Sequence, residues 1–167
     1  MRTLTDQLSR YAEYHRDRRN IATHFIGIPL IVLAIAALLS RPTWPMLSGE
    51  FLLTPAWILF ALATLYYLWL DVPLGIGMGI VSALSAAFGQ WAASQDTSLW
   101  LAIGIGMFVI GWVFQFIGHV RFEHRKPAFV DDIVGLLIGP LFILVELMFG
   151  LGLMRDLHQA IETRAAR

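Results

Sequence analysis

Five apolar stretches, each close to the roughly 20 residues that a helix needs to cross a bilayer, dominate this sequence of 167 residues. They are Ile21–Leu39, Phe51–Leu70, Val72–Ala93, Leu99–Ile117 and Ile133–Met154. Only 14% of the residues are charged, whereas a soluble domain carries about a quarter. We therefore expect an all-α, polytopic membrane helix bundle that forms a single membrane-embedded domain, residues 1–167, rather than a soluble protein with a large core.

Both ends of the chain depart from a simple spanning pattern. Leu4, Leu8 and Tyr11 recur at helical spacing in the polar segment Leu4–Arg19, which predicts a short amphipathic helix lying at the membrane interface. The last apolar stretch contains Gly139-Pro140 and Glu146. These residues favour a broken or re-entrant segment, because irregular backbone is tolerated where protein buries it. The expected architecture is four spans plus a fifth apolar segment that is re-entrant or spanning.

The connections between the apolar stretches predict which helices are neighbours. The loop around Asp71 is so short that the second and third spans must be antiparallel neighbours, and Pro55 suits a first helical turn. Gly75, Gly79, Ala83 and Ala87 follow one another at four-residue intervals. Such a stripe of small residues lets membrane helices approach closely.

Charge and motif content exclude several classes of function. The net charge is zero, which implies no nucleic-acid partner, and the absence of cysteine excludes disulfides and thiolate chemistry. The sequence has no glycine-rich phosphate loop and no HExxH motif. Arginine and lysine gather in the N-terminal segment and in residues 119–132, which the positive-inside rule places in the cytoplasm. We expect an integral multi-pass protein of a bacterial cell membrane or the endoplasmic reticulum, with a cytoplasmic N-terminus.

Histidines gather at the cytoplasmic ends of the apolar stretches. Residues nine apart lie about 180° around a straight helix, so His15 and His24 can converge only if the chain turns between them, within "RDRRN". His119 is expected on the same side of the membrane, with Glu123 one turn further along its helix. A ring of imidazoles suits Fe(II), zinc or another borderline divalent ion. The alternative is that each histidine separately bridges headgroups, water and neighbouring helices.

Three other ionisable residues are compatible with more than one role. Glu146 lies within an apolar stretch and is expected either to accept a hydrogen bond from a ligand imidazole or to tie two helices together. His124 points roughly 140° away from His119 on a helix, and His158 lies near the C-terminus, after the last apolar stretch.

Two motifs resemble a known family. The chain resembles the 2-hydroxy fatty acid dioxygenase family of small multi-pass membrane proteins in "YHRDRRNIATHFIGIP" and in the later "GWVFQFIGHVRFEHRKPAFVDD". A weaker similarity is found in "GPLFILVELMF". The resemblance runs over nearly the whole chain. The positions that carry it are Tyr14, His15, Asn20, His24, Pro29, Gly111, Trp112, Gln115, Gly118, His119, Glu123, Pro127, Ala128 and Asp131. Arg16 departs from members that have two adjacent histidines, and His124 stands where members can carry lysine.

The resemblance implies an Fe(II)-dependent dioxygenase that uses O₂ to shorten a 2-hydroxy fatty acid by one carbon. It implies that His15, His24 and His119 bind the metal. The remaining candidate catalytic residues are Asn20, Gln115 and Glu123.

Each of these roles has alternatives. Gln115 is expected to hydrogen-bond oxygen or substrate, or to tie helices together, and Glu123 to bind the metal or to orient an imidazole. A 2-hydroxy acid can chelate iron through its hydroxyl and carboxylate, with its tail among the spans and membrane lipid. Candidate partners for its carboxylate are Arg16, Arg19 and Arg121, although each also fits a solvated positive-inside charge.

Two hypotheses from other classes compete with this enzyme. A metal-ion or proton-coupled transporter would line a pathway with its histidines, but it often shows paired repeats with broken helices, and no repeat partner is found for the Gly139-Pro140 segment. A lipid-binding or scaffolding membrane protein would leave the histidines dispensable.

Overall fold

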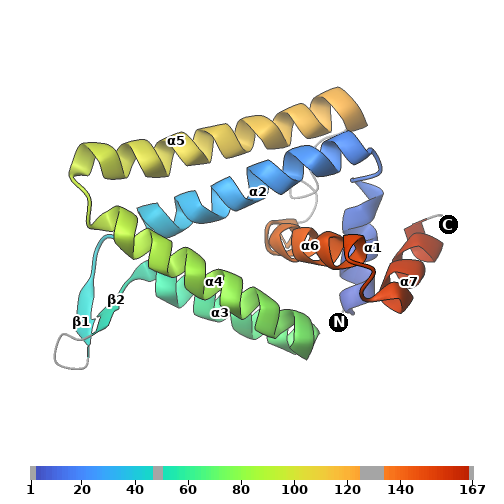
Figure 1. Ribbon diagram of the computed structural model, residues 1–167, viewed down its shortest axis with the longest axis horizontal. Coiled ribbons are helices and arrows are strands. Elements are labelled where there is room, and N and C mark those ends of the chain that lie inside the picture. The colour runs from blue at the N-terminus through green and yellow to red at the C-terminus, as the bar shows by residue number, and fades with distance from the viewer. Residues whose placement is uncertain (1–2, 47–50, 125–133, 166–167) are drawn as a thin grey trace. The chain divides into compact units, whose positions relative to one another are not determined.

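The computed structural model of the chain describes residues 3–46, 51–124 and 134–165 (Figure 1). Most described residues are helical, in the order α1 (Leu4–Glu13), α2 (Arg18–Leu38), α3 (Pro55–Leu70), α4 (Val72–Ala93), α5 (Thr97–Phe116), the π-helix η2 (Ile117–Glu123), α6 (Gly135–Gly150) and α7 (Arg155–Ala165). Two short strands, β1 (Trp44–Met46) and β2 (Phe51–Leu53), pair antiparallel with Pro45 opposite Leu52. The all-α prediction is therefore confirmed, apart from these strands. They lie where a loop and the start of the second span were expected.

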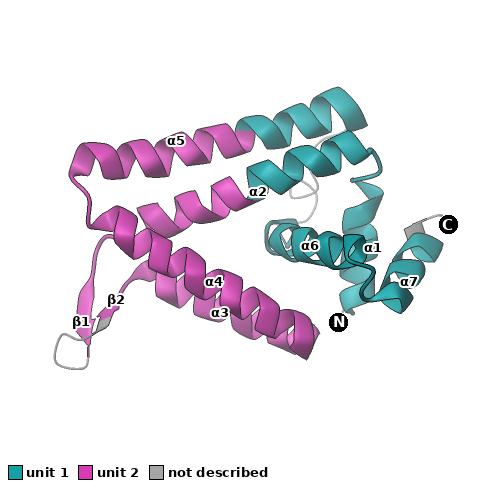
Figure 2. Ribbon diagram, viewed as in Figure 1, with its two compact units in different colours: residues 1–28, 113–167 teal, residues 29–112 magenta. Residues whose placement is uncertain are grey.

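The chain forms two compact units (Figure 2). Unit 1 comprises residues 1–28 and 113–167, and unit 2 comprises residues 29–112, so the boundary falls inside both α2 and α5. Unit 2 has a small core of Ala36, Ala56, Phe60 and Ala86. All the candidate site residues lie in unit 1.

Within unit 2, α3 and α4 form the antiparallel hairpin that the sequence predicted (Figure 1). Asp71 ends α3 and also caps α4, where its side chain accepts a hydrogen bond from the backbone N–H of Leu74 at 2.9 Å. A Cβ at Gly75 would lie 2.5 Å from the Cα of Leu68, so only glycine lets the two helices approach this closely. Pro55 occupies the first turn of α3, as expected.

The expected count of four spans plus a fifth segment is not confirmed. Three described helices are long and apolar enough to cross a membrane: Arg18–Leu38, Val72–Ala93 and Thr97–Glu123. The count rises to four if α6 and α7, which are bent by 118° relative to one another, form one span. The second predicted span is shorter than expected, because Phe51–Leu53 is a strand and α3 has only 16 residues.

The break in the last apolar stretch does not lie at Gly139-Pro140, where the sequence suggested it. Pro140 lies inside an uninterrupted α6, and the helix ends only at Gly150. The chain then turns through Gly152 and Met154, both at positive φ, into the amphipathic α7. At about 1.5 Å per residue, the 16 residues of α6 extend about 24 Å, less than the ~30 Å hydrocarbon thickness.

Within unit 1, α1 is the amphipathic N-terminal helix that the sequence predicted, but it ends at Glu13 rather than near Arg19. A capping box between Thr3 and Asp6 fixes its start. The helix packs against α6 and α7, and Asp6 pairs with Arg164 of α7 at 2.5 Å. The chain therefore leaves α1 six residues earlier than expected, and His15 lies in the turn before α2.

Candidate metal centre

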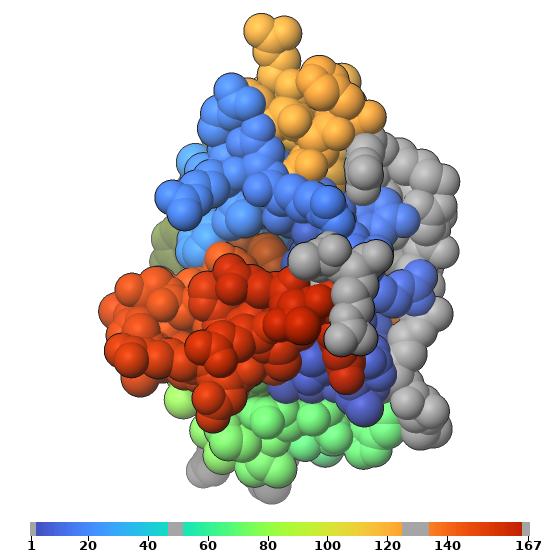
Figure 3. Space-filling view, turned by 90° about the vertical axis from the view of Figure 1, so that its right-hand side faces the viewer, coloured from blue at the N-terminus to red at the C-terminus, as the bar shows by residue number. Residues whose placement is uncertain are grey.

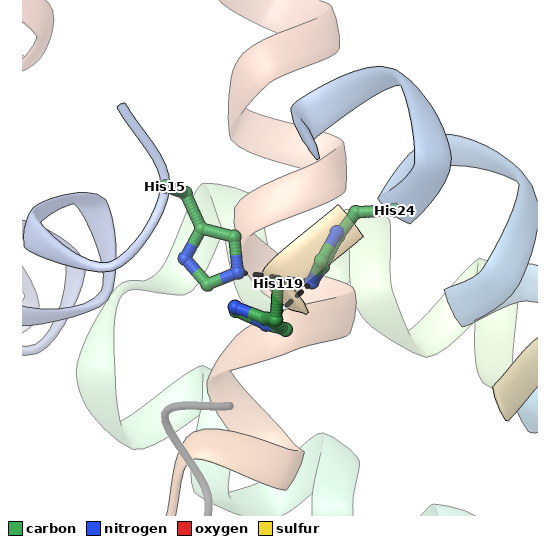
Figure 4. Close-up of side chains that lie close together, drawn as sticks. All are labelled: His15, His24 and His119. Carbon is green, nitrogen blue, oxygen red and sulfur yellow. Dashed lines mark hydrogen bonds between the residues drawn. The ribbon is translucent and has the colours of Figure 1, made fainter. Parts of the chain in front are cut away.

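Three histidine side chains from three parts of the sequence meet in unit 1 (Figure 4). His15 lies in the turn after α1, His24 in the first two turns of α2, and His119 in η2. Their relative exposures are 3%, 0% and 2%. The Nε2 atoms of His15 and His24 are 3.0 Å apart, and those of His24 and His119 are 3.1 Å apart. The structure thus brings together the three residues that the sequence singled out as metal ligands.

Backbone carbonyls fix the protons of two of these imidazoles. Nδ1 of His15 lies 2.7 Å from the carbonyl oxygen of Tyr11, and Nδ1 of His24 lies 2.9 Å from that of Asn20. A carbonyl only accepts, so each Nδ1 carries the proton and each neutral ring presents an Nε2 lone pair. The Nε2 lone pairs of His15 and His24 therefore face each other at 3.0 Å. Such a contact is repulsive unless a cation lies beside both nitrogens.

A proton is poorly suited to act as the cation between the Nε2 atoms of His15 and His24. Burial is the main cause that holds the pKa of His15 well below its ordinary value, and the neighbouring His24 adds to the effect against the hydrogen bond to Tyr11. A divalent metal ion is suited to this role, because neutral imidazole nitrogens bind Fe(II), zinc and related ions. One nitrogen of each histidine lies within 4.8 Å of the others. The residues present therefore fit a metal ion, which His15, His24 and His119 would hold as three neutral ligands.

Glu123, a candidate catalytic residue, lies against the turn that carries His15. Its Oε1 accepts hydrogen bonds from the backbone N–H groups of Arg16 at 2.6 Å and Asp17 at 2.7 Å. Asn20 Nδ2 donates to the same oxygen at 3.3 Å. A carboxylate from η2 thus holds the chain between His15 and His24 in its turn. This geometry favours the expectation that Glu123 orients ligands over the expectation that it binds the metal.

Asn20, the second candidate catalytic residue, is fully buried at the start of α2. Its backbone carbonyl orients the His24 ring, and its side chain also reaches the carbonyl oxygen of Tyr14 at 3.4 Å. Gly118 of η2 lies directly against it, since a Cβ at Gly118 would collide with Asn20 Oδ1 and with Thr23 Oγ1 at 2.3 Å or closer. The glycine therefore lets η2 approach α2 closely enough for His119 to reach His24.

Gln115, the third candidate, precedes His119 by one turn. Its side chain is buried, and its Nε2 has no hydrogen-bond partner among the described residues. Nδ1 of His119 is likewise buried without a partner in that part of the chain. Unpaired buried nitrogens are costly, so each of them is a position where a bound water or ligand oxygen would be stabilised.

Two aromatic residues that sequence reasoning did not assign to the site cover His15. The ring of Tyr11 stacks on His15 with centroids 4.1 Å apart and planes 8° apart, and Phe142 lies 5.0 Å from Tyr11 and 5.6 Å from His15. Gly139 leaves room for the Tyr11 hydroxyl, 3.0 Å from where a Cβ would lie. Tyr11 follows the apolar spacing of α1, so the sequence indicated a buried face but not its partner.

The other ionisable candidates do not join the three histidines. His124 ends η2 in the left-handed conformation and is exposed. His158 stacks on Phe149 at 4.3 Å and lies 3.4 Å from Glu162, while Glu146 is half-buried on α6. Three further positions of the second motif, Pro127, Ala128 and Asp131, lie outside the described residues.

Comparison with known proteins identifies a family and a relative. The family model described as "2-hydroxy-palmitic acid dioxygenase Mpo1-like" matches residues 1–151, which include all three histidines. The chain is also 32% identical over 160 residues to a Saccharomyces cerevisiae protein named "2-hydroxy-palmitic acid dioxygenase MPO1". That alignment covers 95% of this chain and 87% of the yeast protein. No solved structure matches the chain.

Proposed function

The chain belongs to the Mpo1-like 2-hydroxy-palmitic acid dioxygenase family, and we propose that it is itself an Fe(II)-dependent dioxygenase of 2-hydroxy fatty acids. In this proposal the enzyme converts the acid into a fatty acid one carbon shorter, at the cytoplasmic face of the membrane. The observation that carries the proposal is the group of three buried imidazoles with Nε2 atoms of His15 and His24 turned toward each other.

The overall reaction balances without an external reductant. For an acid R–CH(OH)–COOH, one O₂ gives R–COOH, CO₂ and H₂O, so O₂ accepts all the electrons released. The bond between C1 and C2 breaks, C2 becomes the new carboxyl carbon, and C1 leaves as CO₂. Iron bound by His15, His24 and His119 would supply the O₂ activation and a point of attachment for the substrate.

The ligand set favours an anionic substrate. Three neutral histidines contribute no negative charge, so a buried divalent ion would retain its positive charge at the site. A carboxylate compensates that charge, and a hydroxyl on the adjacent carbon can bind beside it. A 2-hydroxy acid meets both requirements.

The protein's own residues hold this arrangement in place. The carbonyl oxygens of Tyr11 and Asn20 fix the tautomers of His15 and His24, so that both Nε2 atoms remain available as ligands. The carboxylate of Glu123 fixes the turn between the two histidines. The rings of Tyr11 and Phe142 pack against His15 and hold its orientation. Gln115 is proposed to bind a substrate or oxygen atom through its unpaired buried Nε2.

The proposal is tested by iron content and turnover measured on the same anaerobically purified samples. Parent protein should hold near-stoichiometric iron and convert 2-hydroxy-palmitic acid into the acid one carbon shorter under O₂. His24→Ala and His119→Ala should each lose both properties. His124→Ala, which changes an exposed histidine outside the group, should retain them. Folded parent protein that holds no metal and shows no turnover after iron reconstitution would overturn the proposal. It would favour the alternative of a metal-ion or proton-coupled transporter.

A further inference from the structure

A pocket of about 770 Å³ lies in unit 1 beside His15. This volume is within the range of small-molecule binding sites, which is about 300–1,000 Å³. Its apolar part includes Phe142 and Phe149 of α6, Ile21 of α2 and Ile161 of α7. Figure 3 shows the C-terminal helix, in red, against the blue N-terminal segments on this side of the unit. His15 is the one member of the histidine group on the pocket wall, so the pocket adjoins the candidate metal centre.

The arginines near His15 differ in the partners of their guanidinium groups and in whether they line the pocket. The neighbouring Arg19 is bound to Asp17 at 2.7 and 3.1 Å, and its guanidinium lies 4.7 Å from the centre of the Phe122 ring. Arg121 is exposed and does not line the pocket. Arg18 lines the pocket, and in the part of the chain that the structure describes its guanidinium has no ion-pair or hydrogen-bond partner. Arg16 lines the same wall.

The pocket has charges of opposite sign on different elements. The arginines come from the turn before α2 and from its first residue, next to His15, whereas Glu146 and Glu162 line the pocket from α6 and α7. His158 of α7 contacts both the ring of Phe149 and the carboxylate of Glu162. A ligand carboxylate is therefore attracted to the arginines and repelled from the α6–α7 side. An acid bound here would therefore place its carboxylate at the arginine side of the pocket.

We infer that this pocket binds the 2-hydroxy fatty acid, with its carboxylate on Arg18 and the first part of its chain against Phe142 and Phe149. The inference rests on the proposed function and names how that site recognises its substrate. Phe142 and Phe149 lie two turns apart on α6, about 10 Å along the axis. The pocket thus holds the head and the first part of the chain, and the rest of a long chain extends into lipid. Arg18 is a specificity residue that selects acids over neutral lipids.

The test compares binding of 2-hydroxy-palmitic acid with binding of 1,2-hexadecanediol, which keeps the chain and the hydroxyl but lacks the carboxylate. Full-length protein is used without O₂, both iron-loaded and metal-free, so that no turnover occurs. Parent protein should bind the acid more tightly than the diol. Arg18→Ala should weaken acid binding about tenfold, as expected for loss of a charged hydrogen bond, and should leave diol binding unchanged. Arg18→Lys should recover most of the difference.

Two controls separate this inference from the proposed function. Arg121→Ala removes the same charge from an exposed position outside the pocket and should leave acid binding unchanged. Iron content should be equal in parent, Arg18→Ala and Arg121→Ala proteins. Unchanged acid binding in Arg18→Ala, or an equal loss in Arg121→Ala, would overturn the inference, even if the parent converts the acid. Iron loss in Arg18→Ala would overturn it as well, because the arginine would then support the metal centre. A parent without iron or turnover would overturn the proposed function, and the metal-free comparison would still decide the role of Arg18.

Discussion

Two short connections between helices are each held by a carboxylate, but the carboxylates come from different distances along the chain. Between α3 and α4, Asp71 caps the helix that it begins, by accepting from Leu74 N–H at 2.9 Å. Between α1 and α2, Glu123 of η2 accepts from the N–H groups of Arg16 and Asp17. Each connection lies within one unit.

The difference shows how the site depends on tertiary structure. Asp71 can form its cap as soon as α4 forms, because donor and acceptor are three residues apart. The turn that carries His15 has its acceptor 106 residues from Asp17. It is fixed only when η2 has packed against the start of α2, and the same packing delivers His119. The packing of η2 against α2 therefore both fixes the turn and brings the three histidines together.

Substitution of Glu123, which holds the turn between α1 and α2, should have the largest effect, a loss of iron affinity. Glu123→Ala removes the acceptor of two backbone N–H groups and frees the turn, so iron affinity should fall roughly 10- to 100-fold, as is typical when a residue that supports metal ligands is lost. Glu123→Gln keeps an acceptor oxygen and should retain most of the iron. Iron content and the dissociation constant for Fe(II) measure both. Equal iron affinity in parent and Glu123→Ala would contradict a role for Glu123 in the turn.

Substitution of Gly118 should have the next largest effect. In Gly118→Ala the new methyl group would meet the side chains of Asn20 and Thr23, and such overpacking costs about 1–3 kcal/mol. We expect a lower Tm together with weaker iron binding, because η2 must move away from α2. Gly106→Ala is the matched control on α5, since a Cβ there meets nothing within 4 Å. Similar losses in the two variants would contradict the close-approach argument.

Removal of the local cap should have a smaller effect, confined to stability. Asp71→Ala should cost about 1 kcal/mol, the usual value for a lost N-cap. Asp71→Ser, which retains a capping oxygen, should recover most of that loss. Iron content should stay at the parental level in both variants, in contrast to Glu123→Ala. Iron loss in Asp71→Ala would show that the two connections are coupled.

The smallest expected effect is a contribution of His15 to the pH dependence of the metal-free protein. Because the pKa of His15 is lowered in the folded state, the unfolded chain binds more protons between that pKa and about 6.5. His15 therefore contributes a loss of stability as pH falls through this window. The Tm of parent protein should fall more between pH 7 and pH 5 than that of His15→Gln. Asp71→Ala should keep the parental pH slope, and an unchanged slope in His15→Gln would contradict the argument.

Much of the fold could be predicted from local sequence patterns. The third apolar stretch, Val72–Ala93, coincides with α4, because apolar length and a capping residue both act locally. The amphipathic α1 and the hairpin of α3 and α4 were predicted for the same reason. The strands and the position of the break after α6 were not predicted. Membrane-type helices tolerate an internal proline when neighbouring groups satisfy the freed backbone, so Pro140 inside α6 was a weak signal of a break.

The candidate site could be predicted in its residue types but not in its geometry. The spacing of His15 and His24 required a turn between them, which we expected within residues 16–20. The turn runs from Tyr14 to Asp17, so only its second half lies where it was expected. The stacking of Tyr11 on His15 and the hydrogen bonds of Glu123 were not predictable, because they depend on contacts between segments far apart in the chain. The sequence offered Arg16, Arg19 and Arg121 as carboxylate partners. The structure shows Arg19 occupied and brings Arg18 to the pocket.

By itself, the sequence determined that the chain is an apolar helical protein with histidines at the ends of its helices, because hydrophobic length and residue type are local properties. Only the tertiary structure decided that three of those histidines converge and that their Nε2 atoms meet. It also decided that a carboxylate of η2 holds the intervening turn. Ring orientation and proton position are set by neighbours that the chain brings together only on folding, and these neighbours are what make the three histidines a candidate metal centre.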